Sequence, residues 1–154
     1  HPDPGFDRRG PAVSLVLDAS LAVSWFFSDE QTKAGRVVLG AVARAGAVVP
    51  SLWRLEVANA LQSAMRRRRI DAAYRDACLV DLAAMSITVD AETDAHAWGA
   101  TLRIADAQGL TIYDAAYLEL AHRCVLPIAT HNGALVAAAR KLGLVVLGGP
   151  SKRR

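Results

Sequence analysis

Short apolar runs rich in β-branched residues alternate with longer segments of helical periodicity, and this alternation restricts the possible folds more than any other feature. The runs predict strands at 12–17, 47–49, 87–89, 127–129 and 144–147. Runs this short, separated by helices, are typical of parallel strands that are buried on both faces. The sequence therefore predicts an α/β fold with a central, mostly parallel sheet of about five strands, covered by helices on both faces.

The segments between these runs are expected to form helices. Apolar residues at helical spacing predict helices over about 20–28, 32–45, 51–67, 92–107, 112–123 and 133–142, and a further one that begins after Asp71. Ser51 and Asp71 are expected to be N-caps. In an open parallel sheet, the ligand crevice lies beyond the carboxyl ends of the strands. Asp18 and residues 130–132 each follow a predicted strand, so we expect them at that edge.

The composition suits a folded domain. The chain has 154 residues, of which 53% are hydrophobic and 21% are charged, which excludes a disordered chain. The apolar runs are too short to cross a membrane. The net charge of +3 equals that of the last three residues, so overall charge is no argument for nucleic-acid binding. We expect residues 1–11 to be a tag scar or disordered extension, 12–148 a single domain and 149–154 a basic tail.

Three acidic residues stand in apolar surroundings far apart in the sequence: Asp18, Glu56 and Asp114. Asp18 follows a strand, where an Asp commonly caps the next helix, and Asp114 follows Thr111 by three residues, as in a capping box. Glu56 lies inside a helix with mostly apolar neighbours, although an exposed polar stripe could also hold it. Asn59, one turn later, is placed either to orient the Glu56 carboxylate or simply to fill the helix surface.

Convergence of the three acids would create a site for a hard divalent cation. Carboxylates that are brought together repel one another, which raises their pKa values unless a cation neutralises them. Mg²⁺, with Mn²⁺ as the alternative, prefers oxygen ligands and keeps several waters. Such an ion lowers the pKa of a bound water and can orient that water against a phosphodiester. The acids therefore indicate metal-dependent hydrolysis of phosphodiester bonds.

Four motifs, taken together, resemble the PIN-domain ribonucleases and, within them, the VapC-type toxins of bacterial toxin–antitoxin pairs. They lie at 16–20, 55–61, 110–121 and 128–132. The resemblance implies a PIN-like three-layer α/β/α sandwich and a cytoplasmic, Mg²⁺- or Mn²⁺-dependent endoribonuclease with Asp18, Glu56 and Asp114 as acidic ligands. It also implies a transfer or ribosomal RNA substrate, a homodimer, and a cognate VapB-type antitoxin that inserts a segment into the active-site groove.

The sequence departs from the family pattern at Asn132, where a fourth acid is common. The Asn132 amide oxygen can still act as a metal ligand, with one negative charge fewer in the site. Thr130 matches the family's hydroxyl position, and it could bond a ligand or cap the last helix. One dense basic run follows the Glu56 segment and comprises Arg66, Arg67, Arg68 and Arg69. These arginines could contact the RNA backbone or the antitoxin, or could stabilise a helix C-terminus.

Two other functions remain open at this level. Asn132 could mark a decayed site, in which case the chain would be a catalytically weakened binding partner that acts through its antitoxin complex. Alternatively, Asp18 could be the phospho-acceptor of an α/β signalling module. That alternative lacks both a second acid two residues after Asp18, which the phosphatase pattern needs, and the Lys expected after a later strand.

Overall fold

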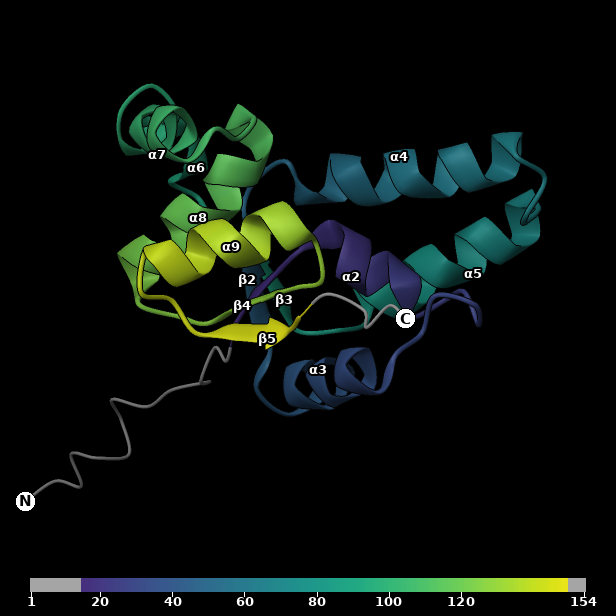
Figure 1. Cartoon of the computed structure of the whole chain (residues 1–154). Helices are drawn as coiled ribbons and strands as arrows, with labels where there is room; N and C mark the ends of the chain where they lie inside the picture. Colours follow the sequence, from purple (N-terminus) through teal and green to yellow (C-terminus); the bar gives the residue numbers. More distant parts are fainter. Residues whose placement is uncertain (1–14, 150–154) are drawn as a thin grey trace, which may run out of the picture.

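The computed structural model describes residues 15–149 and arranges five short strands in one sheet (Figure 1). All neighbouring strands are parallel, in the order β3-β2-β1-β4-β5. The strands are β1 (Val16–Leu17), β2 (Ala47–Val49), β3 (Ile87–Val89), β4 (Ile128–Thr130) and β5 (Val146–Gly148). The predicted α/β class and the five-stranded parallel sheet are confirmed. The expected extension, the start of the first predicted strand and residues 150–154 of the expected tail lie outside the described residues.

Within the described residues, eight helices connect the strands. They are α2 (Ala19–Ser24), α3 (Lys33–Ala45), α4 (Trp53–Arg66), α5 (Ala72–Ala83), α6 (Thr93–His96), α7 (Ala100–Gln108), α8 (Ile112–Cys124) and α9 (Gly133–Lys141). Helices α8 and α9 cover one face of the sheet and α3 lies on the other, so that β5 is in contact with both α3 and α9 (Figure 1). This arrangement gives the three layers of the predicted sandwich.

The strands in the middle of the sheet form the centre of the hydrophobic core. Val16 and Leu17 of β1 and Ile128 and Ala129 of β4 have no exposed surface. Because helices cover both faces, these two pairs of successive strand positions are apolar instead of alternating between apolar and polar residues. The parallel direction of all five strands also brings their carboxyl ends to one edge of the sheet. Residues that follow β1, β2 and β4 therefore meet there.

Two of the helix predictions need correction. The helix predicted over 92–107 is divided into α6 and α7, because Gly99 adopts φ −115° and ψ −105°, which is not helical backbone. Ser51 does not cap α4: the helix begins at Trp53 without a side-chain cap, and the Ser51 N–H donates to Thr93 Oγ1 instead. Asp71, by contrast, caps α5 as predicted.

Helix α8 ends at a left-handed C-cap residue, Val125, with φ 55° and ψ 54°. The Val125 N–H donates to the His122 carbonyl and the Leu126 N–H donates to the Ala121 carbonyl, which is a Schellman arrangement. This conformation costs a residue with a Cβ about 1–2 kcal/mol. Val125 is 85% exposed, so its side chain recovers little of that cost by packing.

We expect Val125→Gly to raise the free energy of unfolding by about 1 kcal/mol in urea titrations, because glycine adopts the left-handed conformation without strain. Val125→Ala is the matched control: it removes the branched side chain but keeps the Cβ, and should recover less stability than glycine does. A glycine variant no more stable than the wild type would show that Val125 is not strained.

Candidate active site

Asp18 follows β1 directly and begins α2 as its N-cap. The residue is buried, and its Oδ1 accepts a hydrogen bond from the Ser20 N–H at 3.4 Å. Its Oδ2 accepts a second bond from the Thr130 hydroxyl at 2.7 Å, across 112 residues of sequence. The first bond confirms the capping alternative for Asp18. The second bond fixes the carboxylate at the carboxyl edge of β1 and β4, so capping does not remove Asp18 from the site.

Glu56 and Asp114 enter the site from two helices. Glu56 lies in the first turn of α4, is partly buried, and accepts a 2.5 Å hydrogen bond from the phenol of Tyr117 on α8. Asp114 lies in the first turn of α8 and is also partly buried. The Thr111 hydroxyl caps α8 by accepting the Asp114 N–H at 3.1 Å, which is one half of the predicted capping box. The Asp114 backbone therefore serves the cap, while its carboxylate belongs to the acidic cluster.

The three carboxylates are close enough to influence one another's charge. Burial raises the pKa of Asp18, Glu56 and Asp114 above the ordinary values. Repulsion by Asp114 adds to the rise at Asp18, and repulsion by both other acids adds to the rise at Glu56. Hydrogen bonds from Thr130 and Tyr117 oppose the rise without cancelling it. The structure thus gathers the acids of three distant segments at one place.

This donor set suits a hard divalent cation. Carboxylate oxygens are the ligands that Mg²⁺ and Mn²⁺ prefer. Burial and mutual repulsion disfavour the negative charges of this cluster, and a divalent cation would neutralise them. Among residues 15–149, no three His, Cys, Asp or Glu side chains are gathered tightly enough to enclose one ion as they stand. A change in the orientation of the Asp114 side chain would therefore accompany metal binding.

Thr130 and Asn132 connect the acidic cluster to α9. Thr130 is fully buried; besides its bond to Asp18, its hydroxyl accepts the Asn132 N–H at 3.0 Å. Asn132, and not Thr130, caps α9, because its Oδ1 accepts the N–H groups of Ala134 and Leu135 at 2.9 and 3.1 Å. The capping alternative for Thr130 was therefore wrong. Metal ligation by Asn132 stays a prediction, and it would compete with this cap for the same oxygen.

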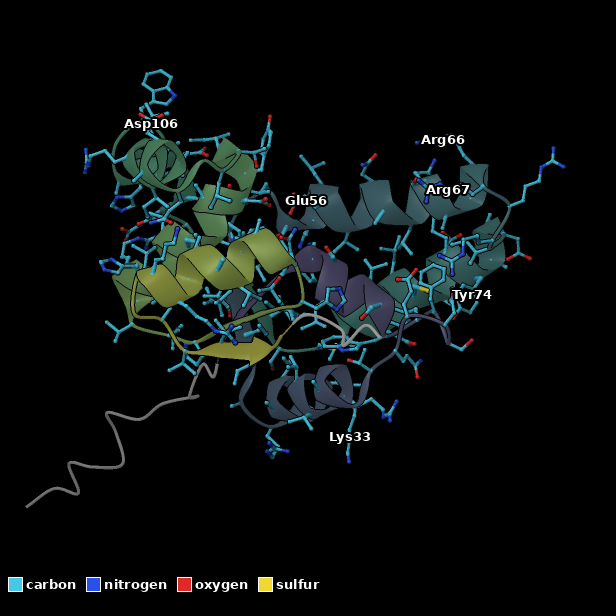
Figure 2. The ribbon with its side chains drawn as sticks, in the orientation of Figure 1. Lys33, Glu56, Arg66, Arg67, Tyr74 and Asp106 are labelled. Carbon is cyan, nitrogen blue, oxygen red and sulfur yellow. The ribbon has the colours of Figure 1, made fainter. Side chains whose placement is uncertain are left out.

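A groove of about 360 Å³ lies along α2 and α4 beside Glu56. Glu56 and Asn59 line one part of it, and Arg67 and Arg69 line another. Glu56 lies toward the start of α4 and Arg67 near the far end (Figure 2), roughly 16 Å away at the helical rise per residue. The groove therefore connects the acidic cluster with positively charged side chains.

The arginine run begins at Arg66, the last residue of α4, and continues through the C-cap Arg67 into the turn that follows, and its members differ in their surroundings. Arg69 forms 2.8 Å ion pairs with both Asp29 and Glu30, and its guanidinium lies 4.5 Å from the centroid of the Phe27 ring. Arg69 therefore attaches the end of α4 to the segment after α2. Arg67 is exposed and lines the groove, which makes it the better placed of the two for an external phosphate.

Tyr117 is the member of this site that sequence analysis missed. Its ring lies in the most buried part of α8 and is 1% exposed, so an apolar pattern accounts for its position. A signal was nevertheless present: a buried Tyr hydroxyl usually finds a hydrogen-bond partner, and Tyr117 stands one turn after Asp114. The partner lies on α4, 61 residues away, and no local pattern could have identified it.

Comparison with known proteins agrees with this architecture. The sequence matches the model of the PIN domain family over residues 15–141, so the chain belongs to the PIN domain family. PIN domains are in general nucleases. No curated protein sequence matches the chain. Within the described residues, no helix is both long and apolar enough to span a membrane.

The solved structures that are similar to the chain include the following two. The crystal structure of PAE2754 from Pyrobaculum aerophilum shares 26% sequence identity with a TM-score of 0.64, over 89% of this chain and 87% of that one. The crystal structure of VapBC2 from Rickettsia felis, bound to a DNA fragment from their promoter, shares 13% identity with a TM-score of 0.57, over 87% of this chain and 97% of that one. The second similarity supports the fold alone.

Proposed function

We propose that this PIN domain is a divalent-metal-dependent endoribonuclease and the toxin of a toxin–antitoxin pair. The observation that carries the proposal is the cluster of Asp18, Glu56 and Asp114, which come from three elements and lie at the carboxyl edge of a parallel sheet. Burial raises the pKa of all three acids, and mutual repulsion adds to the rise at Asp18 and Glu56, so a divalent cation would stabilise their charged forms. The groove from Glu56 to Arg67 offers a path for an RNA strand.

In this proposal the three acids hold Mg²⁺, or Mn²⁺ as the alternative. The metal, when bound, supplies a more acidic water and stabilises negative charge on the phosphate. Asp18 is kept in place by Thr130, and Glu56 by Tyr117, so the site is partly organised before a metal arrives. Asn59 and Arg67 line the groove, where an amide and a guanidinium can bind the sugar–phosphate backbone and orient the scissile bond.

The partner assignment rests on family resemblance. The neighbour from Rickettsia felis is a VapBC complex, and we propose by analogy that a VapB-type antitoxin binds this chain and covers its groove. A homodimer, a cytoplasmic location and a transfer or ribosomal RNA substrate belong to the same proposal. Co-expression with the adjacent reading frame of the source genome, followed by copurification, would test the antitoxin directly.

The direct test of the activity is cleavage of a labelled bacterial RNA pool by the antitoxin-free chain. We expect discrete products in Mg²⁺ or Mn²⁺ and none in EDTA. Calorimetry with Mn²⁺ on the same preparation measures metal binding separately from cleavage. Folded protein that neither binds Mn²⁺ nor cleaves RNA would favour the catalytically weakened binding partner. The structure is compatible with that alternative, because the Asn132 oxygen caps α9 and is engaged there. The family match gives no support to the phospho-acceptor alternative.

Arg67 provides a test of the RNA path. We expect Arg67→Ala to weaken RNA binding about fivefold at moderate salt, and to reduce the slope of log affinity against log salt by roughly 0.7, as one phosphate contact would. Fluorescence anisotropy with a labelled single strand, titrated at several salt concentrations, measures both quantities. Arg36→Ala, which removes an exposed arginine from α3, is the matched control and should leave the slope unchanged. Equal slopes for Arg67→Ala and the wild type would place the RNA elsewhere.

A further inference from the structure

The Tyr117 hydroxyl joins the three elements that carry the acidic cluster. Tyr117 itself lies on α8, three residues after Asp114. Its phenol donates to Glu56 Oε1 on α4 at 2.5 Å, and its oxygen lies 3.4 Å from the N–H of Ala19, from which it accepts. Ala19 is the first residue of α2 and follows Asp18, the cap of that helix. One buried oxygen atom therefore connects the segments of all three carboxylates.

We propose that Tyr117 is a positioning residue, which holds the Glu56 carboxylate toward Asp18 and Asp114 in the geometry that a divalent cation requires. This inference rests on the proposed function. Glu56 is only partly buried, and a Glu side chain has three rotatable bonds, so a carboxylate without a partner would occupy several orientations. The bond from Tyr117 engages Oε1, which leaves Oε2 to face a cation.

The surroundings of Tyr117 make it a suitable support. Tyr117 is 1% exposed and belongs to the hydrophobic core, so packing fixes the position of its hydroxyl. The Ala19 N–H is one of the first amides of α2, which have no partner within the helix, and the phenol oxygen supplies one. The fixed hydroxyl of Tyr117 thus orients the Glu56 carboxylate. It also holds the start of α2, where Asp18 is the cap, in a defined position relative to α8.

The test is the affinity of the full chain for Mn²⁺ alone, measured by calorimetry. We expect Tyr117→Phe, which keeps the ring and removes the hydroxyl, to weaken Mn²⁺ binding about tenfold, as loss of a hydrogen bond behind a ligand does. Tyr74→Phe is the matched control, because it removes a phenol that donates to the Phe26 carbonyl instead. The control variant should bind Mn²⁺ as the wild type does.

A double-mutant cycle identifies the route of the effect. In a Glu56→Gln background, Tyr117→Phe should cause no further loss of Mn²⁺ affinity, because its effect passes through the Glu56 carboxylate. If Tyr117→Phe does not fold, Tyr117→para-fluorophenylalanine fills the space of the hydroxyl without donating a hydrogen bond, and the same tenfold loss is expected.

Three results would overturn the inference. Unchanged Mn²⁺ affinity in the Phe or para-fluorophenylalanine variant would show that the bond does not position Glu56, while the wild type would still bind Mn²⁺ and cleave RNA. An equal loss of affinity in the Glu56→Gln background would assign Tyr117 a purely structural role. A wild type that binds no Mn²⁺ would overturn this inference together with the metal dependence of the proposed function.

Discussion

Asp114→Asn is expected to lower metal-dependent RNA cleavage by at least about a hundredfold, because it removes one charge from the three that the proposed metal site uses. The substitution preserves the shape of the side chain and the backbone N–H that donates to Thr111. The start of α8 should therefore remain intact. Cleavage rates at saturating RNA, measured across a range of Mg²⁺ concentrations, would separate weaker metal binding from a slower reaction.

The matched control is Asp106→Asn, which removes an exposed carboxylate from α7 and should leave cleavage unchanged. The stability of the metal-free protein provides a second readout. Burial raises the pKa of Asp114, so the folded state binds a proton more tightly there than the unfolded chain does. Ionisation at neutral pH therefore disfavours the folded state, and this penalty disappears as the pH falls through the raised pKa.

Neutral Asn removes that penalty at every pH. We therefore expect metal-free Asp114→Asn to be at least as stable as the wild type at pH 7, with a smaller gain in stability between pH 7 and the mildly acidic range. Thermal unfolding in EDTA across this range is the measurement. A variant that unfolds more readily than the wild type at pH 7 would indicate that the Asp114 carboxylate is structural.

Arg123→Met is expected to lower the free energy of unfolding by about 3–5 kcal/mol, because it leaves buried carboxylates without their cation. Arg123 donates to Glu119 at 2.7 Å, one turn earlier on α8, and to Asp90, just after β3, also at 2.7 Å. The side chains of Glu119 and Asp90 are only 5% and 10% exposed. Met retains most of the apolar stem of the arginine, so the loss of stability reports the missing charge and not a change in packing.

The electrostatics of this network support the expected loss. Burial by itself would raise the pKa of Asp90, but hydrogen bonds from Arg123 and Thr93 outweigh burial and place the pKa below its usual value. Asp90 therefore contributes stability above the ordinary Asp pKa, and this contribution is lost on acidification through the lowered value. Urea titrations at pH 7 measure the loss. Arg103→Met on α7, at an exposed position, is the control, and a similar free energy for both variants would refute the network's importance.

Much of the fold could be predicted because the relevant signals are local. Apolar runs identified all five strands to within two residues where described, and helical spacing located most helices. The division between α6 and α7 was missed because Gly99 interrupts a helical pattern through its backbone, which apolar spacing does not report. Ser51 was predicted to be an N-cap, but α4 begins at Trp53 without a side-chain cap, and the Ser51 N–H donates to Thr93, 42 residues away.

The acids of the candidate site could also be predicted from local signals, whereas their hydrogen-bond partners could not. An acid among apolar residues is a visible signal, so Asp18, Glu56 and Asp114 could be selected from the sequence. The contacts that hold them depend on the tertiary structure: Thr130 reaches Asp18 across the sheet, and Tyr117 reaches Glu56 between helices. These partners become apparent only once the chain is folded, because no short-range pattern encodes them.

The position of β1 in the middle of the sheet bears on when the protein can become active during its synthesis. Both neighbours of β1 come later in the chain, β2 at 47–49 and β4 at 128–130. Asp18 therefore emerges from the ribosome long before Thr130, with which it shares a hydrogen bond. Asp114 also lies beyond two thirds of the chain. A partly synthesised chain thus carries its acids apart, and the proposed nuclease would remain harmless to the ribosome and messenger that produce it until nearly all of its residues are available.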